Sequence, residues 1–154
     1  MKTLVLGIGN PILGDDGIGF YVAQELANKV KNKNIDVKNA SVSGLDLLEL
    51  IAGYDKAIIV DAIKTEDGEA GQIYKLSPED FTSTVHLATS LHDTNLATAI
   101  EIGKKLLTEQ MPNEIVIFAV EVEEVIKFTE EMTEKVKETI PKVVNLVLGE
   151  IGST

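Results

Sequence analysis

Short, continuous apolar runs alternate along this chain with longer stretches in which apolar residues recur every three or four positions. Such runs are typical of strands buried on both faces, and the periodic stretches are typical of amphipathic helices. This alternation predicts one α/β domain over residues 1–154, a three-layer α/β/α fold with a mostly parallel, twisted sheet. Right-handed crossovers would place helices on both faces of the sheet. The expected strands are 4–9, 35–41, 56–62, 72–76 and 114–120, and the expected helices are 17–33, 45–51, 93–109 and 133–149, with a helical turn at Ser77 and a kink at Pro141.

The chain is acidic and contains no cysteine. Its formal net charge of -11 should repel nucleic acid and anionic lipid, so we expect neither a nucleic-acid nor a membrane partner. A basic or metal-carrying partner suits this charge better. The absence of cysteine excludes disulfides, thiolate metal sites and a cysteine nucleophile. No apolar run reaches the ~18 residues of a membrane span, and residue 1 leads at once into a strand, so we expect a cytoplasmic protein.

A glycine-rich turn, "GIGNPILGDDGIG" over residues 7–19, joins the first expected strand to the first expected helix. The dinucleotide fingerprint G-x-G-x-x-G requires a third glycine, and isoleucine stands at position 12 instead. Pro11 lacks a backbone N–H, and the carboxylates of Asp15 and Asp16 would compete with a phosphate for the N–H groups of the helix N-terminus. A nucleotide-binding oxidoreductase is therefore the less favoured alternative.

Asp15 and Asp16 are adjacent acids at the expected start of a helix. One of them can cap the helix, but a second adds repulsion and needs a cation, a solvated position or a function. Asp61 ends the apolar run "AIIVDA", and His92 precedes the helix expected from residue 93. Taken singly, Asp61 reads as a solvated acid or cap and His92 as a satisfied polar residue.

Three of these positions gain weight together, because sites in open α/β sheets form beyond the carboxyl ends of the strands. The predicted sheet brings Asp16, Asp61 and His92 to that one edge. Two carboxylates and an imidazole make an open site for a divalent ion, and these ligands suit Zn, Ni, Mn or Fe. The residue types alone do not choose among these metals.

Three segments resemble, in the right order, the motifs of the maturation endopeptidases of [NiFe] hydrogenases. They are "LVLGIGNPILGDDGIGFYVAQEL", "IIVDAI" and "SLHDTNL". The segment "FAVEVEEVIKFTEEMTEKVKETIPKVV" is similar to the C-terminal region of that family, although Ala119 and Val122 stand where members often have Gly and Pro. The resemblance runs from Met1 to about Leu148.

The resemblance implies a single hydrogenase maturation protease domain that removes the C-terminal extension from the precursor of a [NiFe] hydrogenase large subunit after nickel insertion. It assigns metal contact and catalysis to Asp16, Asp61 and His92, and leaves Asp15 to cap or orient. Nickel is expected to arrive with the precursor, so we expect no tightly bound cofactor and a monomeric enzyme that uses water as the attacking group. A non-catalytic metal-binding maturation factor is the remaining alternative.

Overall fold

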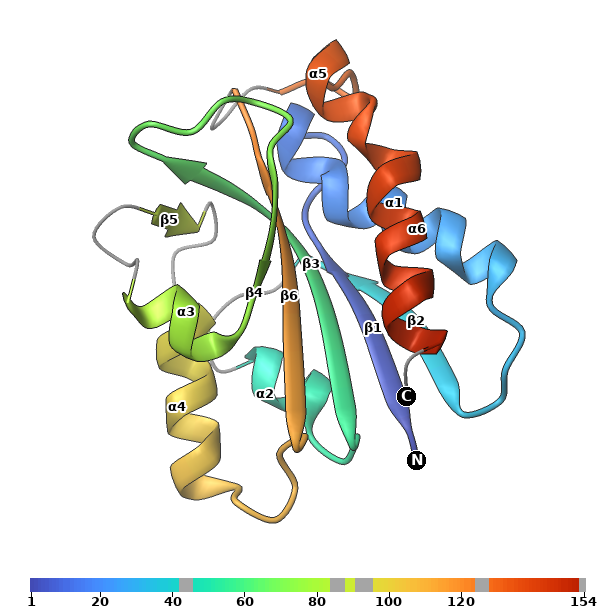
Figure 1. The fold of residues 1–154 in the computed structure, drawn as a ribbon, viewed down its shortest axis with the longest axis vertical. Helices are drawn as coiled ribbons and strands as arrows, with labels where there is room; N and C mark the ends of the chain where they lie inside the picture. The colour runs from blue at the N-terminus through green and yellow to red at the C-terminus, as the bar shows by residue number, and fades with distance from the viewer. Residues whose placement is uncertain (42–45, 84–87, 91–95, 124–127, 153–154) are drawn as a thin grey trace.

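The computed structural model describes residues 1–41, 46–83, 88–90, 96–123 and 128–152. A six-stranded sheet of order β2-β1-β3-β6-β4, with β5 paired to β3, lies between two layers of helices (Figure 1). The elements, in chain order, are β1 (Thr3–Ile8), the 3₁₀ turn η1 (Gly14–Gly17), α1 (Ile18–Lys29), β2 (Ile35–Ala40), α2 (Asp46–Ile51), β3 (Lys56–Thr65), β4 (Ile73–Leu76), α3 (Pro78–Ser83), β5 (Ala88–Ser90), α4 (Leu96–Leu106), β6 (Glu114–Glu121), α5 (Glu134–Lys137) and α6 (Thr139–Gly152).

The sheet is mostly parallel, as predicted. Strands β2, β1, β3 and β6 run parallel, whereas β4 is antiparallel to β6 and β5 is antiparallel to β3. Helices cover both faces, which confirms the three-layer arrangement. No helix in the described ranges has the length and apolar character that a membrane span requires.

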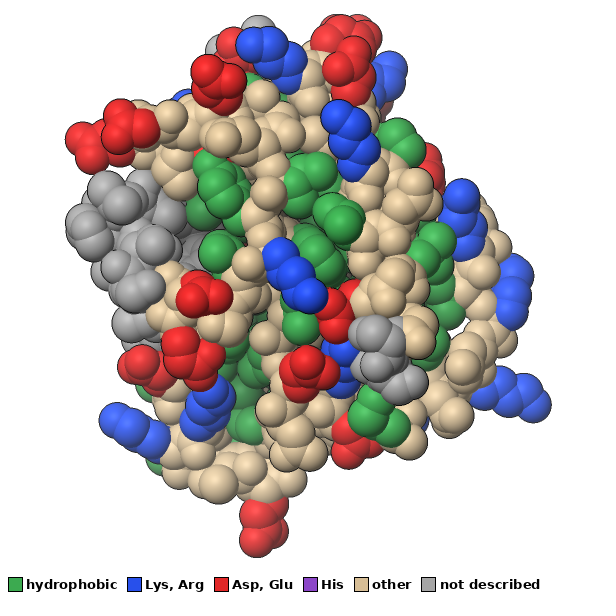
Figure 2. All heavy atoms as spheres, in the orientation of Figure 1, with side chains coloured by type: hydrophobic (Ala, Val, Ile, Leu, Met, Phe, Trp, Pro, Cys, Tyr) green, Lys and Arg blue, Asp and Glu red, His purple; other side chains and the backbone are tan. Residues whose placement is uncertain are grey.

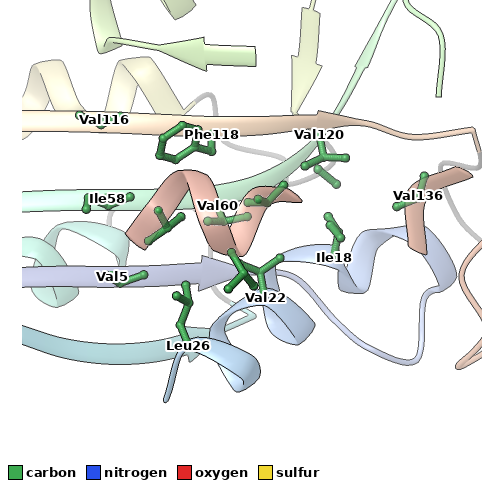
Figure 3. Close-up of a cluster of buried hydrophobic side chains, with 14 of the residues drawn as sticks. Val5, Ile18, Val22, Leu26, Ile58, Val60, Val116, Phe118, Val120 and Val136 are labelled. Atoms are coloured by element: carbon green, nitrogen blue, oxygen red, sulfur yellow. The ribbon is translucent and has the colours of Figure 1, made fainter. Parts of the chain in front are cut away.

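Buried apolar side chains fill both faces of the sheet, which explains the continuous apolar runs in the sequence. Along β3, Ile58 and Val60 belong to the core beneath α1 and α6, while Ile59 belongs to the core beneath α2 and α4. Figure 3 shows Val22 and Leu26 of α1 in the first of these cores, together with side chains of β1, β3 and β6. Each such Val, Leu or Ile contributes about 1.5–3 kcal/mol by leaving water.

The ends of the first helix and of β3 differ from the prediction by three or four residues. The first helix ends at Lys29, four residues early, because Val30 is extended and a turn at Asn32 leads into β2. Strand β3 continues to Thr65, three residues beyond the expected end. The last residues of β3, Lys64 and Thr65, are polar and look like a loop in the sequence. In the structure, β6 pairs with β3 as far as Ile63, and β5 pairs with β3 over residues 63–65.

The last expected helix is two helices. The chain breaks at Glu138, between α5 and α6, three residues before Pro141. A proline has no N–H and its ring crowds the carbonyl four residues earlier, which here belongs to Lys137, so a continuous helix through this point would be costly. Pro141 instead lies in the first turn of α6, where a missing N–H loses no bond.

The third expected helix is shorter, and one strand was not predicted. Helix α4 covers residues 96–106 of the expected 93–109, and the expected residues 93–95 lie outside the described part of the chain. The missed strand is β5, whose three residues carry no periodic pattern. Such a short strand is specified by its pairing with β3, which a reading of local sequence cannot detect.

A buried ammonium group ties the amino edge of the sheet to the last helix. Lys56 opens β3 and is almost inaccessible, and its Nζ lies 2.7 Å from Glu150 Oε2 and 3.2 Å from Glu114 Oε1. Lys75 reaches the other oxygen of Glu150 at 2.8 Å. Hydrogen bonds and charge from Lys56 and Lys75 lower the pKa of the Glu150 carboxyl.

Candidate active site

In the glycine-rich turn after β1, the backbone of Asp16 packs closely against Gly9. A Cβ on Gly9 would lie 2.1 Å from the carbonyl oxygen of Asp16, so only glycine permits this approach. Asp16 Oδ2 accepts a hydrogen bond of 2.9 Å from the backbone N–H of Asn10, and the residue is 3% exposed. The turn therefore presents a buried carboxylate just beyond the end of β1.

Two further glycines bring α1 directly onto the sheet. A Cβ on Gly7 would lie 2.0 Å from the carbonyl oxygen of Gly19, and one on Gly19 would lie 2.3 Å from that of Ile8 and 2.7 Å from that of Val60. The close approach that these glycines allow is thus between the protein's own backbone segments. They require no phosphate to explain them, which weakens the nucleotide-binding alternative.

Asp61 lies within β3 and not at its end, which corrects the position predicted from the sequence. It pairs in register with Ala119 of β6, while the preceding Val60 pairs with Gly7, close to the end of β1. Its Oδ1 accepts a bond of 2.8 Å from the N–H of Ala62, and the residue is 4% exposed. Because β3 outruns β1, Asp61 still lies level with the carboxyl end of β1, where η1 contacts β3.

The third predicted site residue, His92, lies outside the described residues. Ser90, the last residue of β5, pairs with Ile63, two positions beyond Asp61. The described residues 88–90 therefore reach the edge of the sheet that carries the two aspartates. Within the described ranges, no three His, Asp or Glu side chains form a group that could hold a metal ion. The three-residue site thus stays a prediction.

Asp15 differs from its neighbour in what it binds. Its Oδ1 accepts a bond of 2.8 Å from the N–H of Thr133, and its Oδ2 lies 3.3 Å from the N–H of Glu123 and 3.0 Å from the Thr133 hydroxyl. Asp15 is buried and joins η1 to a segment more than 100 residues away. It orients a distant segment, a role that local sequence could not reveal.

Comparison with known proteins supplies the decisive observation. Residues 20–150 match the model of a family described as hydrogenase maturation protease. The chain belongs to this family. The protease is 30% identical over 155 aligned residues to a putative hydrogenase maturation protease of Methanocaldococcus jannaschii, covering 96% of this chain and 95% of the relative. It is 26% identical over 121 residues to the hydrogenase 2 maturation protease of Escherichia coli, covering 78% and 73%.

Solved structures have the same fold as the protease. The hydrogenase maturating endopeptidase HybD from E. coli superposes with a TM-score of 0.81 at 24% identity, over 99% of this chain and 93% of that one. The [NiFe] hydrogenase maturation protease HycI from Thermococcus kodakarensis gives 0.75 at 26% identity, over 95% and 89%. The predicted family and the predicted class of enzyme, a peptide hydrolase, are confirmed.

Sequence reasoning gave no role to Glu121, which the protease buries completely at the end of β6. Its carboxylate accepts bonds from the N–H and hydroxyl of Thr65 at 2.7 and 2.6 Å, and from the hydroxyl of Tyr74 at 3.1 Å. Burial, together with the hydrogen bond and charge of Glu121, raises the pKa of Tyr74. Glu121 therefore joins the ends of β3, β4 and β6 beside the candidate site. Its signal in the sequence is an acid that closes an apolar strand.

We expect Glu121→Gln to lower the free energy of unfolding by about 1–3 kcal/mol, because an amide NH₂ would face donors that now bond to a carboxylate. Urea denaturation at pH 7 measures this change. Glu123→Gln is the matched control, since the Glu123 side chain is exposed and its bond to Asp15 uses only the backbone. It should stay within about 0.5 kcal/mol of the parent. Equal stability of both variants would contradict a structural role for Glu121.

Proposed function

We propose that this protease removes the C-terminal extension from the precursor of a [NiFe] hydrogenase large subunit after nickel has been inserted. Membership of the hydrogenase maturation proteases supports the substrate class. The observation that carries the proposal is the placement of two buried acids, Asp16 and Asp61, at one edge of the sheet. Each is oriented through one oxygen by a nearby backbone N–H. Acids held in this way resist rearrangement when a cation approaches.

The donor set fits a divalent ion carried by the substrate. Carboxylate oxygens, with the imidazole of His92 as third ligand, suit a borderline metal such as nickel and offer no soft thiolate for permanent retention. A divalent ion polarises a carbonyl or lowers the pKa of bound water to about 7. Asp16, Asp61 and His92 would hold the ion-bearing segment next to the scissile bond. We therefore propose that nickel belongs to the substrate and that the protease keeps no tightly bound cofactor.

Water is the attacking group in this proposal. The chain contains no cysteine, and aspartates that hold a metal are not available as nucleophiles. Cleavage would then depend on nickel insertion, because the ion is part of what the site recognises. We also propose that the protease works as a cytoplasmic monomer, with neither nucleic acid nor membrane as partner. The net charge of -11 supports this, because it would repel both nucleic acid and an anionic membrane surface.

The nickel requirement predicts a difference between two forms of one substrate. Nickel-loaded precursor should be cut, whereas rigorously metal-free precursor should remain intact, since only the first gives Asp16 and Asp61 an ion to hold. Mass spectrometry of the large subunit before and after incubation measures the loss of the extension. Nickel added back to the metal-free precursor is the control for damage during metal removal. Equal cleavage rates for the two forms would show that the ion is not recognised, and binding without any cleavage would favour a non-catalytic maturation factor.

A further inference from the structure

One carboxylate, that of Asp15, fastens two stretches of the chain beside the candidate site, one ending at Glu123 and one containing Thr133. Asp15 accepts the N–H of Glu123 in the first stretch and the N–H and hydroxyl of Thr133 in the second. A buried, charged acceptor makes stronger bonds than a neutral one. Glu123 and Thr133 are therefore held at η1, one residue before Asp16.

Main-chain bonds also fasten Thr129 to the glycine-rich turn. The N–H of Thr129 donates to the carbonyl of Ile12, and the carbonyl of Thr129 accepts the N–H of Gly14, both at 2.8 Å. Leu13 and Thr129 form a parallel bridge. These bonds join residues 12–14 of the glycine-rich turn to residues 128–129, so the two stretches lie side by side on the same edge as Asp16.

Two large apolar side chains are exposed where these stretches meet. Phe128 is 83% exposed and Ile12 is 47% exposed. A single exposed apolar residue needs no explanation. Here two are brought together by backbone pairing, and one of them, Ile12, lies four residues before Asp16. Aromatic side chains on a fixed backbone are typical anchors of protein interfaces.

Exposed acidic residues lie close to Phe128 along the chain. They are Glu123, Glu130 and Glu131. A hollow of about 510 Å³ runs along α5. Its lining has three acids and one basic residue, Glu130, Glu131, Glu134 and Lys137, beside Tyr21, Met132 and Ile140. Figure 2 shows both acidic and basic side chains over α5, and acidic side chains over the loop after β3, at the end of the molecule where the carboxyl ends of the parallel strands lie.

We propose that Ile12 and Phe128 form a docking surface for the large-subunit precursor, which would contribute an apolar contact bordered by Lys and Arg. This inference rests on the proposed function, because a chain that reaches Asp16 and Asp61 must pass this edge. The charge argues for this partner over a second copy of the protease. A second copy would oppose Glu130 and Glu131 with acids of its own, and such like-charge contacts are unfavourable.

The test measures binding to purified, metal-free precursor that still carries its extension, which keeps docking separate from cleavage. Phe128→Ala should raise the Kd at least tenfold, because it removes the exposed anchor without touching the core. Leu106→Ala is the matched control, since Leu106 is 76% exposed at the end of α4. It should leave the Kd unchanged. Isothermal titration calorimetry gives the Kd, and circular dichroism melts confirm that both variants fold.

The charge of the surface is tested separately. The double change Glu130→Lys and Glu131→Lys should weaken binding at least tenfold in low salt and flatten its dependence on salt. Glu109→Lys, an exposed acid beyond α4, should have no such effect. Equal Kd values for Phe128→Ala and the parent, or no binding of metal-free precursor by the parent, would overturn the docking surface. So would a dimer that Phe128→Ala dissolves in sedimentation analysis. Failure of the proposed function is distinct, because it would appear as uncut nickel-loaded precursor whatever the Kd.

Discussion

Asp61→Asn should abolish most of the processing activity while leaving the fold as stable as before. The amide keeps an oxygen that can accept the N–H of Ala62, so the backbone of β3 retains its bond. The lost charge removes a proposed metal contact. Substituting an outer-shell partner of a metal already costs about 10–100-fold, so the loss of a direct contact should cost at least as much. A cleavage assay on nickel-loaded precursor measures the rate.

The stability of the same variant separates a site residue from a structural one. If Asp61 is a site residue, the free energy of unfolding at pH 7 should be unchanged or raised by up to about 1 kcal/mol, as is common when a functional acid is neutralised. If Asp61 only caps the backbone, about 1 kcal/mol should be lost with processing retained. Asp55→Asn is the matched control, because Asp55 precedes the opposite end of β3 and its carboxylate accepts the backbone N–H of Lys2 at an exposed position. A destabilised but fully active Asp61→Asn protein would remove Asp61 from the site.

Glu150→Gln should lower the free energy of unfolding by about 3 kcal/mol, near the lower end of the cost of breaking a buried ion pair. Lys56 would remain buried and, among the described residues, would keep the more exposed Glu114 as its acidic partner. Thermal and urea denaturation measure the loss, and processing should persist because this pair lies at the amino edge of the sheet. Glu79→Gln is the control. Glu79 also pairs with a lysine, Lys104, but at the surface, where a pair contributes about 0–1 kcal/mol.

The ion pair between Lys56 and Glu150 sets the direction in which stability changes with pH. The folded-state pKa of Glu150 is lowered by hydrogen bonds and charge from Lys56 and Lys75. Its contribution to stability is therefore fully present above the ordinary glutamate pKa of about 4.3 and is lost as the pH falls through the lowered value. The difference in stability between the parent and Glu150→Gln should shrink over that acidic range. A difference that stays constant down to pH 2 would contradict the assignment.

The sequence predicted the parts of the fold that depend on burial. Strands β1, β3 and β6 are apolar on both faces, so their runs identify a central parallel sheet without any knowledge of register. The rule that sites lie beyond the carboxyl ends of such strands then brought Asp16 and Asp61 to one edge. Asp61 was nevertheless predicted at the end of its strand. In the structure β3 continues beyond it to Thr65, because these last residues pair with β5 and β6.

Features fixed by distant partners were not predictable. The partners of Asp15 lie 108 and 118 residues along the chain, and those of Glu121 lie 56 and 47 residues away. Contacts between residues so far apart produce no periodic pattern in the sequence. Asp15 and Asp16 look equivalent in the local sequence. They differ because Asp15 bonds to Glu123 and Thr133, two residues that follow β6. Asp16 instead accepts the N–H of Asn10, within its own turn.

The link between Lys56 and Glu150 has a practical consequence for handling the enzyme. The backbone N–H of Lys56 also donates to the carbonyl of Lys2, so the first strand and the last helix share the amino edge of the sheet. Figure 1 shows the start of β1 and the end of α6 at that edge, with α5 and the glycine-rich turn at the other. A linker joined to either end would therefore leave the opposite edge facing solution. Protease immobilised in this way on a sensor surface would keep its aspartates and Phe128 turned toward a precursor flowing past.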